Sequence, residues 1–269
     1  MPQINSPTPT PRTALVTGAS AGIGASFARL LAARGYNLIL VARREDRLRQ
    51  LSEELSSEYP NRYEVVVADL ADPSEPRRIV TASQELGMPI DFLVNNAGFG
   101  GIEMFPDTPW PALAAEIQVM ITASTELSHL VLPGMKERGW GRIINVSSIA
   151  AFMPPTAGLL YTAIKSYLLH FSQSLDLEVK AYGIRVSALC PGFTRTEFHT
   201  DMTKPDALNT RLPASAWQQS DEVAREGYDA AMAGKPVVVT GRVNRILVAL
   251  VGRLPESWRY FMGSKSTAF

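Results

Sequence analysis

Three side chains in the middle of the chain are of the right types and spacing to move a proton. Tyr161 and Lys165 lie four residues apart in a helical pattern, so they share one face, and Ser148 precedes them. A tyrosine ionises at about pH 10, and a nearby ammonium group lowers that pKa by stabilising the phenolate. With Ser148 hydrogen-bonded to a substrate oxygen, this set predicts proton transfer at that oxygen.

A glycine-rich segment near the N-terminus has the composition of a phosphate-binding loop. Thr17–Gly24 follows an apolar run, precedes a helical stretch and has the spacing G-x-x-x-G-x-G. Glycine lets the backbone turn tightly and approach a pyrophosphate, whose charge then lies at a helix N-terminus. A tight turn of small residues is the alternative. The residues expected to bind a dinucleotide are Gly18, Ser20, Ala21, Gly22, Ile23 and Gly24.

The end of the second apolar run indicates which dinucleotide binds. A carboxylate at this point binds the ribose 2′-hydroxyl of NAD, whereas an arginine accommodates the 2′-phosphate of NADP. Here the run ends in Arg43 and Arg44, and the acids Glu45 and Asp46 are expected at the start of the next helix. We therefore predict NADP(H), with Arg43 as the main phosphate contact and Arg44 in support; two solvated surface charges are the alternative.

These residues must be positioned by a regular alternation of strands and helices. Short Val/Ile/Leu-rich runs predict buried parallel strands, and amphipathic stretches between them predict helices. The predicted strands are 13–17, 37–41, 63–68, 92–95, 142–146, 184–189 and 236–240. The predicted helices are 23–34, 45–57, 73–86, 110–138, 156–182 and one that begins near 221. This order predicts an α/β, Rossmann-like doubly wound fold with a mostly parallel sheet.

Taken together, the motifs resemble the short-chain dehydrogenase/reductase family in its compact single-domain form. The resemblance covers about residues 12–240 and rests on Thr17–Gly24, Asn95-Asn96-Ala97-Gly98, Ser148, Tyr161 with Lys165, and Pro191-Gly192. It implies a seven-stranded sheet, no metal in the chemistry, a dimer or tetramer built on the two long helices, and Tyr161 as general acid/base. It further implies cofactor contacts from Asp69, Leu70, Asn96, Ala97, Gly98, Tyr161, Lys165, Pro191, Gly192, Thr194 and Thr196.

One position departs from the family pattern. Many members carry an asparagine on the first long helix, where it bends the helix and anchors a water that leads protons to the lysine; here that position is Met120. A thioether is at best a weak acceptor. Either the enzyme uses another proton path, or the site binds NADP(H) with weak activity. We therefore predict an NADP(H)-dependent oxidoreductase acting on a carbonyl/secondary-alcohol pair, with a weakly active NADP(H)-binding regulatory or scaffold protein as the alternative.

The composition excludes several other classes. The 26 basic and 26 acidic residues balance, which argues against a nucleic-acid partner. The single Cys190 cannot form an intramolecular disulfide and favours a reducing, cytoplasmic location. His129, His170 and His199 lack metal-ligand spacing, and no apolar run approaches the roughly 20 residues of a membrane span.

Three segments lie outside this alternation. We expect residues 1–11 to be a disordered tail and about 197–220 to be a substrate lid. The lid and its surroundings contain apolar residues that could line a partly apolar substrate site or only pack the lid: Phe152, Met153, Phe193, Phe198, Met202, Leu212 and Trp217. The extension 241–269 mixes arginines with apolar residues, so it could contact a membrane surface or cover a subunit interface, and Pro255 predicts two short helices.

Overall fold

The strands form where the sequence is richest in Val, Ile and Leu. In the computed structural model, which describes residues 11–100, 105–154, 159–197 and 217–265, seven strands make one parallel sheet. Its order is β3 (Tyr63–Val67), β2 (Asn37–Ala42), β1 (Thr13–Thr17), β4 (Ile90–Asn95), β5 (Gly141–Val146), β6 (Ile184–Cys190) and β9 (Val237–Val239). From β1 the chain adds β2 and β3 on one side of the sheet, and then crosses to add β4, β5, β6 and β9 on the other. The direction in which strands are added therefore reverses between β1 and β4.

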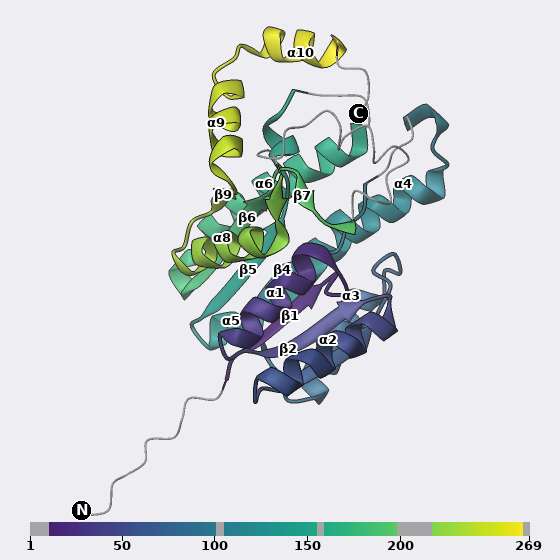
Figure 1. Cartoon of the computed structure of the whole chain (residues 1–269), viewed down its shortest axis with the longest axis vertical. Coiled ribbons are helices and arrows are strands. Elements are labelled where there is room, and N and C mark those ends of the chain that lie inside the picture. The colour runs from purple at the N-terminus through teal and green to yellow at the C-terminus, as the bar shows by residue number, and fades with distance from the viewer. Residues whose placement is uncertain (1–10, 101–104, 155–158, 198–216, 266–269) are drawn as a thin grey trace, which may run out of the picture.

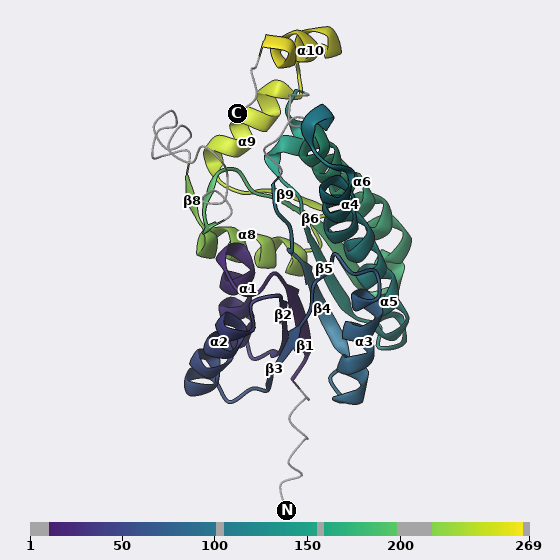
Figure 2. The same ribbon diagram turned by 90° about the vertical axis from the view of Figure 1, so that its right-hand side faces the viewer.

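Helices cover both faces of this sheet (Figures 1 and 2). One face carries α1 (Gly22–Ala33), α2 (Glu45–Glu58) and α8 (Ser220–Met232), and the other carries α3 (Glu75–Glu85), α5 (Ala123–Glu137) and α6 (Leu159–Val179). Strand side chains alternate between the two cores: Ala14 and Val16 pack on the first face and Leu15 on the second. The central strands β1, β4, β5 and β6 are therefore buried on both sides, whereas the edge strands β3 and β9 are only partly buried.

Shorter elements complete the description. A π-helical turn, η2 (Gln118–Thr122), joins α4 (Trp110–Ile117) to α5, and β7 (Thr194–Arg195) pairs in parallel with β8 (Gln218–Gln219). The 3-10 turns are η1 (Phe105–Asp107), η3 (Ile149–Phe152) and η4 (Lys180–Tyr182). The chain then continues into α9 (Arg242–Val251) and α10 (Glu256–Lys265).

The predicted α/β doubly wound fold is confirmed, and every strand of the main sheet is parallel. The predicted helix 110–138 is interrupted by η2, and the extension forms two helices on either side of Pro255, as predicted. Residues 1–10 and 198–216 lie outside the described residues, and with them Phe198, His199, Met202 and Leu212. Within the described ranges, no helix is long and apolar enough to cross a membrane. In the same ranges, no cluster of three or more His, Cys, Asp or Glu side chains could hold a metal ion.

Candidate active site

The predicted site residues lie where the parallel strands end. All strands of the sheet run the same way, so their carboxyl ends meet at one edge, beside the point where strand order reverses. The segments that follow these ends are the loop after β1, Arg43 after β2, Asp69 and Leu70 after β3, Asn96–Gly98 after β4, Ser148 after β5, and Pro191–Thr196 after β6. The topology therefore gathers residues from across the chain at one edge.

The glycine loop has backbone angles and close contacts that residues with a side chain could not readily adopt. Gly18 and Gly22 have φ of +66° and +54°, in the left-handed region that favours glycine. A Cβ on Gly24 would collide with the carbonyl oxygen of Gly18. The described residues offer no side-chain cap to the N-terminus of α1, and its first turn holds no acid. This helix end can accept a phosphate, whose charge suits the free N–H groups.

Asn96 ties this loop to the centre of the sheet. Its side-chain amide donates to the carbonyl oxygen of Thr17 at 3.0 Å, and its backbone N–H donates to Thr17 Oγ1 at 2.9 Å. The N–H of Ala97 donates to the same hydroxyl at 3.0 Å. Leu70 is buried at the end of β3, whereas Asp69 is exposed there.

The segment after β6 lies directly over the loop. A Cβ on Gly22 would approach Thr196 Cγ2 to 2.9 Å, so the residue that follows β7 is in close contact with the loop. The carbonyl of Pro191 accepts from the N–H of Ile149 at 2.9 Å, and Thr194 Oγ1 donates to the carbonyl of Gly192 at 3.0 Å. These bonds join the segment that carries Ser148 to the one that carries Thr194 and Thr196.

An arginine cluster lies beside the loop, with a composition that differs in part from the prediction. Arg44 donates to Ser20 Oγ at 3.0 Å and to the carboxylate of Glu197 at 2.8 Å. Arg47 donates to the same carboxylate at 2.5 Å, and these arginines hold the pKa of Glu197 below its usual value. Arg43, predicted as the main contact, is exposed and takes no part in this cluster of described residues.

Sequence reasoning missed Arg47 and Glu197. A signal for Arg47 was present, because it follows Arg44 by three residues at the start of a predicted helix and so shares its face. Glu197 had no such signal: it is 150 residues beyond Arg47 in the chain, and the contact of the preceding Thr196 with the loop brings it to the cluster.

Ser148, Tyr161 and Lys165 come together as their spacing predicts. The hydroxyls of Ser148 and Tyr161 share a hydrogen bond, and Ser148 Oγ also accepts from the N–H of Ala150 at 3.1 Å. The Nζ atom of Lys165 lies 5.4 Å from the centre of the Tyr161 ring and donates to the carbonyl of Val146 at 2.9 Å. Lys165 is buried, and Ser147 Oγ fixes its backbone by donating to its carbonyl at 2.6 Å.

The expected lowering of the tyrosine pKa is not seen in this arrangement. Burial raises the pKa of Tyr161 above its ordinary value, and the hydrogen bond from Ser148 only partly opposes this. Burial also lowers the pKa of Lys165 to about 8, because a desolvated ammonium group is disfavoured. At neutral pH this site therefore holds a protonated phenol beside a mostly charged ammonium group.

Met120 lies within the π-helical turn and is buried. A Cβ on Gly98 would approach its sulfur to 3.0 Å, so the thioether packs against the segment after β4. A helix irregularity is therefore present at this position although asparagine is not. Such π-turns are frequent at functional sites.

The remaining candidates near this edge have packing contacts. Cys190 is fully buried, and burial raises the pKa of its thiol to about 12, which agrees with the expected small buried hydrophobe. The rings of Phe193 and Trp217 lie 5.6 Å apart, and Phe152 packs against the cluster that contains Cys190. His170 Nδ1 lies 2.9 Å from the carbonyl of Ser166 within its own helix.

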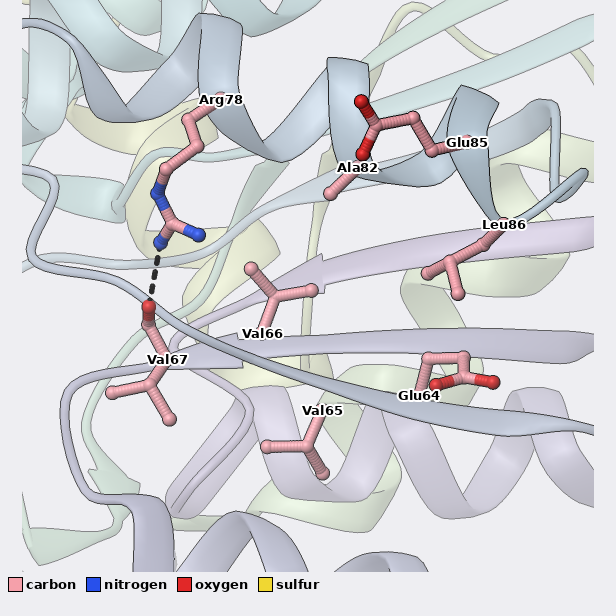
Figure 3. A pocket seen from close by; sticks show the side chains of 8 residues that line it. All are labelled: Glu64, Val65, Val66, Val67, Arg78, Ala82, Glu85 and Leu86. Carbon is pink, nitrogen blue, oxygen red and sulfur yellow. Dashed lines mark hydrogen bonds between the residues drawn. The ribbon is translucent and has the colours of Figure 1, made fainter.

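A groove elsewhere on the molecule is lined by β3 and α3 (Figure 3). Arg78 reaches across it to the carbonyl of Val67 at 2.6 Å, which satisfies a backbone group on the outermost strand. None of the predicted site residues lines this groove. We therefore interpret it as a feature of the sheet edge, where Arg78 covers part of the outermost strand.

Comparison with known proteins identifies the family to which this chain belongs. The family model described as short chain dehydrogenase matches residues 12–207. The very-long-chain 3-oxoacyl-CoA reductase of Anas platyrhynchos is 35% identical over 196 residues, which is 71% of this chain but only 62% of that protein. The inactive hydroxysteroid dehydrogenase-like protein 1 of Homo sapiens is 35% identical over 258 residues, 94% of this chain and 75% of that protein.

A solved structure shows the same arrangement of elements. The short-chain dehydrogenase from Sphingobium yanoikuyae, in complex with NADPH, superposes with a TM-score of 0.79 at 31% identity, over 95% of this chain and 96% of that one. Because the superposition covers 95% of this chain, the structural similarity extends beyond the glycine loop to nearly the whole chain.

Proposed function

Because this chain belongs to the short-chain dehydrogenase/reductase family, we propose that it is an NADP(H)-dependent oxidoreductase that interconverts a carbonyl and a secondary alcohol. The observation that carries the proposal is the cluster of Ser148, Tyr161 and Lys165 beside a glycine loop at one edge of the sheet. These groups supply what proton transfer at a substrate oxygen requires.

The residues present fit a phosphorylated dinucleotide. The uncapped end of α1 and the glycine backbone suit a pyrophosphate. Arg44 brings positive charge to Ser20, Arg47 shares the carboxylate of Glu197 with it, and no acid lies at the tip of β2. Arg43, exposed at the same strand end, stays within this proposal as a further contact. NADPH is the cofactor in the related Sphingobium yanoikuyae structure.

The chemistry divides between the cofactor and the chain. When bound, NADP(H) would supply or accept the hydride. In the reductive direction, Ser148 holds the carbonyl oxygen and Tyr161 donates its proton to it. The raised pKa of Tyr161 keeps the phenol protonated at neutral pH, which is the form that a general acid needs. Lys165 places a positive charge beside the ring and stabilises the phenolate that forms.

A second function is favoured by Met120 and by one relative. The buried thioether cannot replace the hydrogen bonds of an amide, and the human relative is named an inactive hydroxysteroid dehydrogenase-like protein. The second candidate is therefore an NADP(H)-binding regulatory or scaffold protein. We rank it below the enzyme because Ser148, Tyr161 and Lys165 are all present.

The substrate and assembly proposals follow the family. The substrate is a small, partly apolar carbonyl compound or alcohol, in keeping with the rings of Phe193 and Trp217 near the site. We also propose a homodimer or homotetramer built on the two long helices, and a cytoplasmic location for which the buried, unpaired Cys190 gives support.

Two measurements test the proposal: the first tests the cofactor assignment, and the second separates the two candidate functions. The first is calorimetric titration of the purified chain with NADPH and with NADH, for which we expect NADPH to bind at least about tenfold more tightly; equal or better binding of NADH would overturn the cofactor assignment. The second is consumption of NADPH across a panel of ketones and aldehydes. Binding without consumption of NADPH would favour the second candidate.

A further inference from the structure

The helices α9 and α10, here termed the C-terminal helix pair, leave apolar side chains exposed. On α9, Val243, Ile246, Leu247 and Leu250 follow the i, i+3, i+4, i+7 spacing of one helix face and are 53%, 63%, 40% and 57% exposed. A neighbouring side of the same helix holds the buried Asn244 and Val251. The helix therefore faces the body with one side and solvent with an apolar side.

The second helix repeats this pattern with aromatic residues. Trp258, Phe261 and Met262 follow the i, i+3, i+4 spacing on α10 and are 64%, 56% and 46% exposed. Tryptophan is enriched where apolar and aqueous regions meet, because its ring is apolar and its N–H is polar. Large apolar side chains gathered on adjacent helices in this way mark an interaction surface.

Polar contacts hold the C-terminal helix pair to the body. Asn244 Nδ2 donates to the carbonyl of Thr240 at 2.9 Å, and Arg259 donates to the carbonyl of Phe152 in η3 at 3.0 Å. Figures 1 and 2 show both helices (yellow) at one end of the molecule, and the bond to Phe152 places α10 beside η3, the turn that follows Ser148. The apolar side is thus held in place rather than folded back on the core.

The charge of this region identifies the kind of partner. Residues 242–265 contain five basic side chains and one acidic one, a net charge of +4 in a chain whose total is zero, so the remainder carries −4. Arg242 and Arg253 are exposed and form no ion pair within the described part of the chain. A two-fold contact between copies would place these like charges together, which disfavours a second copy as the partner.

We propose that the C-terminal helix pair docks in the plane of an anionic lipid surface. The apolar faces would enter the boundary between headgroups and acyl chains, and Arg242 and Arg253 would pair with lipid phosphates. Each helix has 10 residues, about half the length needed to cross the hydrocarbon core, so the pair lies on the bilayer.

The test is sedimentation of the full chain with vesicles of phosphatidylcholine, with and without phosphatidylglycerol. We expect binding to the anionic vesicles that weakens in high salt and falls by about tenfold or more in Ile246→Ser/Leu250→Ser. The matched control is Met232→Ser, which removes an apolar side chain that is 38% exposed at the end of α8. Circular dichroism checks that all variants are folded.

Two results would overturn the proposal. One is wild-type protein that stays in the supernatant with anionic vesicles, or binds equally well after both substitutions. The other is a light-scattering measurement in which the wild type is an oligomer and Ile246→Ser/Leu250→Ser is a monomer. This result would assign the apolar side to the contact between copies. Neither readout requires cofactor or turnover, so the outcome is independent of the proposed reaction.

Discussion

At the scale of single residues, burial and charge decide which protonation states the site can hold. Tyr161 and Lys165 are both desolvated, which favours the neutral form of each: the pKa of the phenol rises and that of the ammonium group falls to about 8. In the arginine cluster, the Glu197 carboxylate sits between Arg44 and Arg47, in contact with guanidinium groups that a 2′-phosphate would need.

Glu197 should compete with the cofactor phosphate. Glu197→Gln removes the carboxylate charge, so we expect NADPH to bind about three- to tenfold more tightly while the affinity for NADH changes little. Calorimetric titration measures both. Glu45→Gln is the control, because Glu45 pairs with Arg49 on the same helix at similar exposure. Unchanged or weaker NADPH binding in Glu197→Gln would contradict the competition.

Lys165 should make stability depend on pH. Its pKa is lowered from 10.5 to about 8, so between these values the unfolded chain holds a proton that the folded chain has lost, and unfolding becomes harder as pH rises. Relative to Lys165→Met, the wild type should gain about 2 kcal/mol of unfolding free energy between about pH 7 and pH 9.5. Urea denaturation measures this, with Lys180→Met, at an exposed lysine, as control. A constant difference would show that Lys165 is not desolvated.

At the scale of elements, strand ends and helix starts position the site. The sequence predicted these well, because apolar runs bounded by glycine or charge are local signals, and Ser148, Tyr161 and Lys165 met as expected. Contacts across the fold were not predictable in this way. The pairing of Glu197 with Arg44 and Arg47 depends on the contact of the preceding Thr196 with the glycine loop, and the π-turn has no local signature around Met120.

The π-turn provides a test of the proton path. Met120→Asn places an amide where a buried thioether packs against Gly98, which should lower stability by about 1–3 kcal/mol. We expect the reduction rate to stay the same or fall, because the present site does not depend on an asparagine there. Steady-state kinetics on an identified substrate provide the check, and a clear rise in kcat would show that the missing asparagine limits the enzyme.

At the scale of the whole molecule, a zero net charge conceals an uneven distribution. Positive charge gathers in the arginine cluster and in residues 242–265. Both regions suit anionic partners, one a nucleotide phosphate and the other a lipid headgroup. The strand topology brings the first region to the sheet edge, and the contacts of α9 and α10 hold the second beside it.

The assembly is expected to use a different surface from the C-terminal helix pair. With the interface on the two long helices, α4–α5 and α6, light scattering should show a dimer or tetramer in the wild type. The variant Ile246→Ser/Leu250→Ser should have the same mass. A monomer at micromolar concentration would contradict the proposed assembly without affecting the fold.

The most direct test of the central claim compares Tyr161→Phe with the wild type in reduction of an identified carbonyl substrate by NADPH. Phenylalanine keeps the ring and removes the proton donor. The account predicts a fall in kcat of about 10²- to 10⁴-fold, with NADPH affinity nearly unchanged. A Tyr161→Phe variant that retains the full rate would contradict it.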